Sequence, residues 1–256
     1  MTRGNLYSYG IALILIFALG CGGEKKEEQA AKPAVAPAKP TGIGTIAGTV
    51  NFTGKAPRAA RLRMNADPVC LKQHTKTVYG EKVVVNENAT LRHVLVYVKD
   101  GLSGRKFDAP EEKVIFDQKA CLYTPHMVGI QVGQEFVVRN SDPTLHNVHT
   151  LSKENKPFNI AQPKQGMTFT RKFETPETFR IKCEVHTWMN AYVGVFTHPF
   201  YAVTGDEGTF ELKDLPAGEY TVEAWHEKYG AQTMKVTVGA AETATVEFTY
   251  EGKTGV

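Results

Sequence analysis

The sequence has no excess of charge of one sign and no sustained helical pattern. Its 30 Lys and Arg residues stand against 27 Asp and Glu residues, a formal net charge of +3. It therefore lacks the basic excess that nucleic-acid binding usually requires, and the even charge identifies no partner. No window keeps an apolar period of 3.6 residues, which argues against an all-helical protein. With 256 residues, 42% of them apolar, the chain is nevertheless large enough for one or two domains with packed cores.

The sequence also lacks an N-terminal apolar run long enough to span a bilayer. Ile11 to Gly20 reaches only about 15 Å as a helix, about half of a hydrocarbon core. A charged start, a short apolar stretch and small residues before a cut are typical of a secretory signal, which we place at residues 1–20. The letters FALGC at 17–21 resemble a bacterial lipobox, with Cys21 as the lipidated mature N-terminus. Ordinary signal cleavage is the alternative, and either process predicts an extracytoplasmic protein.

Residues 21–42 contain no aromatic residue and consist mainly of Glu, Lys, Ala, Pro and Gly. Such a composition cannot form a core, so this segment is predicted to be a flexible linker. With the lipid on Cys21, it attaches the folded part to a bacterial membrane, in the periplasm or at the cell surface. Residues 251–256 are predicted to be a short tail.

The rest of the chain alternates apolar residues with period two in many short segments separated by turns. This pattern predicts an all-β protein built from β-sandwiches. The predicted strands are centred on Ile46–Phe52, Val94–Val98, Val128–Val132, Phe136–Val138, Phe179–Cys183, Phe210–Leu212, Tyr220–Val222, Met234–Val238 and Val246–Tyr250.

The four cysteines divide into three predicted roles. Cys21 is assigned to the lipid, and Cys183 belongs to a cluster of possible metal ligands, which leaves Cys70 and Cys121. In an oxidising compartment a disulfide between these two is natural. Two buried thiols are one alternative, and metal ligation together with His74 or His126 is the other.

The most informative pattern is Cys183, His186 and Met189 in one short loop, preceded by His146 in the segment NSDPTLHNVH at 140–149. A thiolate, two imidazoles and a thioether form a ligand set that suits both oxidation states of copper. Three ligands at the end of one strand, with a fourth from an earlier loop, allow a rigid sandwich to fix the geometry of one metal ion.

These residues resemble the cupredoxins, the small blue copper proteins, over roughly residues 112–198. The resemblance is closest to members of the amicyanin type, which have the spacing Cys, two residues, His, two residues, Met. It implies one type 1 copper ion with His146, Cys183 and His186 as close ligands and Met189 as a weak axial ligand. It also implies that Asn147 ties the two ligand loops together, and that electrons pass through an exposed edge of His186.

The same residues allow other roles, each of which leaves part of the pattern unexplained. Cys183 and His186 as nucleophile and base lack an orienting group or an oxyanion motif. A zinc site leaves Met189 unexplained, and a core cysteine with surface histidines leaves the whole spacing unexplained. The loop has no second cysteine for a binuclear copper centre. A second metal site assembled from scattered histidines stays open; the candidates are His126, His149, His198 and His226.

A second resemblance covers the C-terminal part. The segment AVTGDEGTF at 202–210 and the turn LPAGEY at 215–220 resemble a carboxypeptidase regulatory-like, transthyretin-like (prealbumin-like) sandwich. The strands at 44–50 and 91–98 resemble the opening strands of the same family. We therefore expect residues 43–105 to pair with 199–250 in one small sandwich. The Greek-key cupredoxin domain, residues 106–198, is expected to be inserted between them.

The predicted function is transport of single electrons between redox proteins of unknown identity by one copper ion. The protein is expected to be neither an enzyme nor a nucleic-acid-binding protein. Copper binding for storage, delivery or sensing is the first alternative. The second is a surface interaction module without redox activity.

Overall fold

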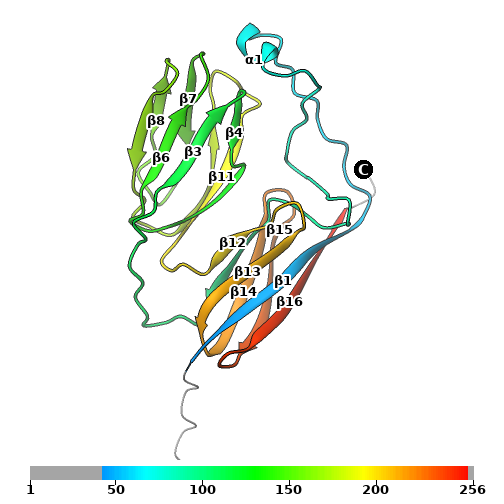
Figure 1. Cartoon of the computed structure of the whole chain (residues 1–256), viewed down its shortest axis with the longest axis vertical. Coiled ribbons are helices and arrows are strands. Elements are labelled where there is room, and N and C mark those ends of the chain that lie inside the picture. Colours follow the sequence, from blue (N-terminus) through cyan, green and yellow to red (C-terminus); the bar gives the residue numbers. More distant parts are fainter. Residues whose placement is uncertain (1–41, 253–256) are drawn as a thin grey trace, which may run out of the picture. The chain divides into compact units, whose positions relative to one another are not determined.

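The structure is a computed structural model that describes residues 42–252. Within this range the chain forms sixteen strands and one short helix (Figure 1), which confirms the predicted all-β class. The helix, α1, spans Pro68–Lys72. Among the residues described, no helix combines the length and apolar character needed to cross a membrane.

The first sandwich consists of a three-stranded sheet, in the order β13-β1-β16, and a four-stranded sheet, in the order β12-β2-β14-β15. Its strands come from both ends of the described chain. They are β1 (Ile43–Gly54), β2 (Leu95–Asp100), β12 (Tyr201–Val203), β13 (Thr209–Pro216), β14 (Gly218–His226), β15 (Gly230–Val238) and β16 (Thr243–Gly252).

The core of the first sandwich follows directly from the period-two pattern. Every second residue of β16 is buried, because successive side chains of a strand point to opposite faces. β1 pairs in parallel with β16 and antiparallel with β13, so the N-terminal strand is held on both sides by C-terminal strands. The strands before residue 101 and after residue 200 therefore share one core.

Gly48 lies where β1 approaches β16 too closely for any side chain. A Cβ atom at this position would lie 1.8 Å from the carbonyl oxygen of Val246 and 2.7 Å from the ring of Phe210. We expect Gly48→Ala to lower the free energy of unfolding by about 2 kcal/mol, because the backbone must shift to relieve the overlap. Urea unfolding measures this change. Gly205→Ala is the matched control, since a Cβ there meets nothing within 4 Å; equal midpoints for the two variants would contradict the prediction.

The second sandwich consists of a five-stranded sheet, in the order β5-β11-β10-β7-β8, and a four-stranded sheet, in the order β4-β3-β6-β9. All nine strands are contiguous in the sequence. They are β3 (Val114–Lys119), β4 (Leu122–Thr124), β5 (Met127–Gln131), β6 (Phe136–Asn140), β7 (His146–Thr150), β8 (Asn159–Gln162), β9 (Thr168–Arg171), β10 (Glu177–Lys182) and β11 (Asn190–Phe196).

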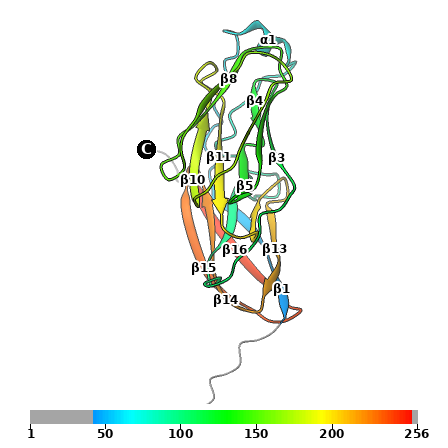
Figure 2. The ribbon, with the colours of Figure 1, turned by 90° about the vertical axis from the view of Figure 1, so that its left-hand side faces the viewer.

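Residues 55–80, which connect β1 towards β2, form a segment that we call the cap. Its two ends run side by side through backbone hydrogen bonds from Leu62 to Val78 and from Gly80 to Ala60, and α1 lies at its tip. Met64 and Cys70 are buried in the core of the second sandwich. Figures 1 and 2 show α1 beside one end of that sandwich. A segment that leaves the first sandwich thus completes the core of the second.

The two sandwiches meet through a small apolar cluster of Leu95, Met127 and Phe196. Glycines on β5 and β11 allow the close approach. A Cβ at Gly129 would lie 2.3 Å from the ring of Tyr201, and one at Gly194 would lie 2.4 Å from Leu95.

His226, at the end of β14, lies in the first sandwich beside Tyr229 and Tyr250 and is 1% exposed. Burial lowers its pKa from 6.5 to about 4. Between these two values the unfolded chain binds a proton that the folded chain does not bind, so stability falls as the pH falls. We expect the metal-free protein to lose about 2 kcal/mol between pH 7.5 and pH 5 from this group. Urea unfolding at both pH values should show a smaller loss in His226→Phe, and an equal loss would contradict the assignment.

Candidate metal centre

The loop of residues 183–189 connects β10 to β11 and is closed by its own hydrogen bonds. The N–H of Cys183 donates to the carbonyl of Met189 at 3.1 Å, and the N–H of Met189 donates to the carbonyl of His186 at 2.9 Å. The N–H of His186 donates to the Cys183 sulfur at 3.3 Å. These bonds close the loop through its own backbone and bring the N–H of His186 to the sulfur of Cys183.

His146 begins β7, which lies beside β10 in the five-stranded sheet. Because the two strands are antiparallel, the start of β7 lies beside the loop that follows β10. The Nδ1 atoms of His146 and His186 are 2.9 Å apart, and the Cys183 sulfur lies with a nitrogen of each imidazole inside a 4.8 Å cluster. All three side chains are at most 3% exposed. Two imidazoles and one thiol therefore converge on one buried point.

Met189 is also buried, 1% exposed, in the core that contains Cys183. Trp188 packs beside the loop, with its ring 5.0 Å from that of His186 and its indole N–H donating to the carbonyl of Cys121 at 3.0 Å. The sequence places four sulfur and nitrogen ligands in this region, and the structure brings the thiol and both imidazoles together.

The environment of Cys183 favours its thiolate. Burial alone raises the pKa of a thiol, but hydrogen bonds from His146 and His186 and from the backbone N–H groups of His186 and Asn147 outweigh burial. Together they lower the pKa of Cys183 from 9.0 to about 6. Since the thiolate is the form that binds metals, the site is prepared for a soft cation.

Asn147 connects the two ligand-bearing segments. Its side-chain oxygen accepts a hydrogen bond from the N–H of Glu184 at 2.6 Å, and its amide donates to Asn159 of β8. The residue after His146 is thereby tied to the residue after Cys183.

Asp142 holds the outer edge of His146. The His146 Nε2 atom lies 2.8 Å from its carboxylate, which also accepts from the N–H groups of Ala120 at 2.8 Å and Cys121 at 2.7 Å. Ala120 and Cys121 form the two-residue turn between β3 and β4, with positive φ angles of 53° and 55°. This backbone is costly for residues other than glycine. One buried carboxylate thus both stabilises the turn and orients the imidazole.

Asp67, at the start of α1, orients His186 as Asp142 orients His146. Its carboxylate lies 3.0 Å from His186 Nε2, and it accepts from the hydroxyl of Thr144 at 2.9 Å and from the N–H of Val69 at 2.7 Å. The sulfur of Cys70 is 3.6 Å from the same nitrogen. His186 is consequently 3% exposed. The expected exposed edge of His186 is wrong for this protein, because the cap covers it.

Cys70 and Cys121 are joined by a disulfide with a Cα–Cα distance of 5.5 Å, and Cys183 is a free buried thiol. The disulfide connects α1 of the cap to the β3–β4 turn, next to the positions that Asp142 stabilises. His74, a suggested metal partner of these cysteines, instead contacts the carbonyl of Ala120 at 2.7 Å.

The other histidines lie in separate surroundings. His126 contacts Glu227 at 2.5 Å, His149 contacts Glu184 at 2.6 Å, and the nitrogen of His198 accepts from the N–H of Phe200. Within residues 42–252, no group of three converging metal-ligand side chains contains His126, His149, His198 or His226. Cys21, the signal peptide at 1–20 and most of the linker at 21–42 lie outside the residues that the structure describes.

Sequence reasoning did not identify Asp142, Asp67 or Thr144. Asp142 has a local signal, since it lies four residues before His146. Asp67 lies 119 residues before His186, and nothing in its neighbourhood in the sequence connects it to the ligand loop.

Comparison with known proteins bears on two parts of the chain. Residues 189–251 match the carboxypeptidase regulatory-like domain family, which confirms that resemblance for this segment. The match begins at Met189, immediately before β11 of the second sandwich, and continues through the strands of the first that follow it. No curated protein matches the chain.

Solved cupredoxin-type structures are similar to part of the chain. The copper-containing nitrite reductase of Thermus scotoductus SA-01 has 18% identity over 38% of this chain and 25% of its own, with a TM-score of 0.32. A purple cupredoxin from Nitrosopumilus maritimus has 23% identity over 32% and 99%, with a TM-score of 0.29. A Cu(I) amicyanin variant has 18% identity over 39% and 97%, with a TM-score of 0.30. The chain thus spans only a quarter of the length of the nitrite reductase.

Proposed function

We propose that this protein is an extracytoplasmic carrier of single electrons that uses one type 1 copper ion. The observation that supports this most strongly is the buried convergence of Cys183 with His146 and His186. In this assignment these three residues are the close ligands, and Met189 is the weak axial ligand. A thiolate with two imidazoles in a trigonal set is the donor chemistry of blue copper sites. When bound, copper supplies a reversible one-electron couple.

The residues of the chain itself orient the ligands and shield the site. The Nε2 atoms of the two imidazoles lie at hydrogen-bond distance from Asp142 and Asp67, so the Nδ1 atoms, which face each other at 2.9 Å, are the ones that would bind the metal. Because these supports and the loop bonds come from the chain itself and hold the ligands in place, the ligands need not reorganise when the charge of the ion changes. The cap keeps water and small ligands away from His186. A rigid site that excludes solvent favours electron transfer, because the metal then stays bound. Storage or delivery instead requires that the metal can leave the site.

The location and partners belong to the same proposal. Cleavage after residue 20 and lipid attachment to Cys21 place the folded part outside the cytoplasm, tethered to a bacterial membrane. The partners are redox proteins, and the protein is a carrier rather than an enzyme. Replacing Cys21 with Ser should move the protein from the membrane fraction to the soluble fraction, and unchanged fractionation would refute lipid attachment.

The decisive test is the visible absorption spectrum after addition of cupric ion to the purified metal-free protein. We expect an intense thiolate-to-copper band in the wild-type chain and complete loss of this band in Cys183→Ser. His149→Ala is the matched control, because His149 contacts Glu184 at the surface and does not share the ligand cluster. A wild-type chain that binds only zinc, or no metal, would overturn the proposal and favour an interaction module.

A further inference from the structure

The cap concentrates positive charge that is evenly balanced in the chain as a whole. Its six lysines and arginines are all exposed, and none forms an ion pair within residues 42–252. They are Lys55, Arg58, Arg61, Arg63, Lys72 and Lys76. The single carboxylate of the cap, Asp67, is turned inward to His186 and Thr144. All fully exposed charged side chains of the cap are therefore cationic, although the whole chain has a net charge of only +3.

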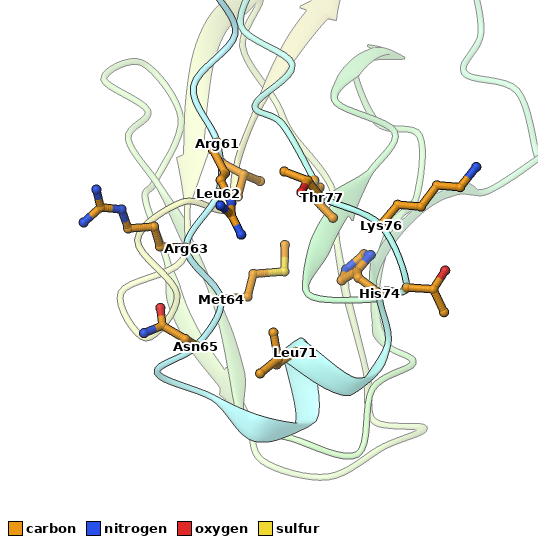
Figure 3. A pocket seen from close by; sticks show the side chains of 11 residues that line it. Arg61, Leu62, Arg63, Met64, Asn65, Leu71, His74, Lys76 and Thr77 are labelled. Atoms are coloured by element: carbon orange, nitrogen blue, oxygen red, sulfur yellow. The ribbon is translucent and has the colours of Figure 1, made fainter.

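The same segment contains an open groove of about 810 Å³ (Figure 3). Met64 and Leu71 lie in its middle, while Arg63 and Lys76 lie on opposite sides. Leu71 is 54% exposed, so its apolar side chain is accessible in the groove. The groove thus has apolar side chains at its base and cations at its sides. Such a groove is complementary to a partner surface on which carboxylates flank an apolar side chain.

This groove lies directly outside the candidate metal centre. Leu71 follows Cys70, whose sulfur is 3.6 Å from His186 Nε2, and Asp67 at the start of α1 is 3.0 Å from the same atom. Because His186 has almost no exposed surface, a redox partner that uses this ligand must dock on the segment that covers it. A membrane bound to this face would block such a partner.

We infer that the cap is the docking surface for a redox protein whose contact face presents acidic residues around an apolar side chain. This inference rests on the proposed function, since it names the chemistry of the electron-transfer partner. Attraction between the basic cap and an acidic face raises the rate of encounter and weakens with added salt.

The test compares two one-electron oxidants of opposite charge in stopped-flow mixing with the full chain carrying reduced copper. Hexacyanoferrate(III) is an anion and tris(1,10-phenanthroline)cobalt(III) is a cation; each takes one electron from one copper ion. We expect Arg61→Glu/Arg63→Glu to slow oxidation by the anion about tenfold at low ionic strength and to speed oxidation by the cation. The control is Lys213→Glu/Lys235→Glu, with the same change in net charge on exposed positions of β13 and β15. It should change both rates less than about twofold. Equal effects of the two double variants would overturn the inference.

Binding of a synthetic Glu-rich peptide with a central Leu tests the partner chemistry without redox activity. We expect the peptide to bind the wild-type chain and the Lys213/Lys235 control, and to bind the Arg61/Arg63 variant at least tenfold more weakly. Phosphatidylglycerol vesicles provide the membrane arm, and binding to vesicles without binding to the peptide would overturn the inference. Melting temperatures show whether the variants are folded. If neither oxidant reacts, the proposed function fails, and the peptide arm still decides whether the cap binds acidic protein surfaces.

Discussion

Replacing both Cys70 and Cys121 with alanine is expected to lower the free energy of unfolding of the metal-free protein by about 4 kcal/mol. The disulfide joins positions 51 residues apart, so it removes a large amount of loop entropy from the unfolded chain. Urea unfolding measures the change. Wild-type protein treated with a dithiol reductant is the control and should unfold at the midpoint of the double variant. An unchanged midpoint in both would show that packing of the cap, and not the cross-link, determines stability here.

The same variant is expected to lose copper faster. Without the disulfide, α1 is held over His186 by the contacts of Asp67 with His186 and Thr144, by the contact of His74 with Ala120 and by the buried Met64 side chain. Loss of an outer partner of a metal-bound histidine typically weakens metal binding 10–100-fold. Transfer of copper to a chelator, followed by decay of the visible band, should therefore be about tenfold faster or more. If copper transfer is as slow as in the wild-type protein, the cross-linked cap does not limit the release of copper.

Replacing Asp142 with alanine is the second change with a large expected effect. Asp142 is 1% exposed and accepts from His146 and from the N–H groups of Ala120 and Cys121. Its removal leaves buried donors without acceptors, at a cost of about 3 kcal/mol in the metal-free protein. It also releases the imidazole of His146, so copper should bind 10–100-fold more weakly.

Two measurements check the Asp142 prediction, urea unfolding without metal and copper affinity in a competition titration. Asp142→Asn is the matched control, because it keeps the size of the side chain and one acceptor oxygen while removing the charge. We expect the asparagine variant to lose less stability than the alanine variant, because one oxygen still accepts, and to bind copper less tightly than the wild-type chain. If alanine and asparagine are equally harmless to copper binding, Asp142 does not orient His146.

The sequence determined the elements whose signals are local. Period-two alternation identified the strands, because side chains of a strand alternate between core and surface wherever one face is buried. The spacing of Cys183, His186 and Met189 grouped three candidate ligands in a single loop, since six residues cannot separate far. The turn motif around Gly208 and the strands that follow it identified the carboxypeptidase regulatory-like segment, which the family match confirms at 189–251.

The surroundings of the metal centre depend on how distant segments pack together. The cap has no alternation of apolar and polar residues from which strands could be predicted. Its helix α1 has five residues, which is too short to show a helical period. Its contacts with His186 join residues 119 positions apart, so they depend on how the β1–β2 connection packs on a different sandwich. Burial of His186 and the concentration of six cations above it are consequences of that packing. Residue order fixes which side chains are neighbours along a strand or loop, whereas the cover over a site depends on the free energy of packing distant segments together.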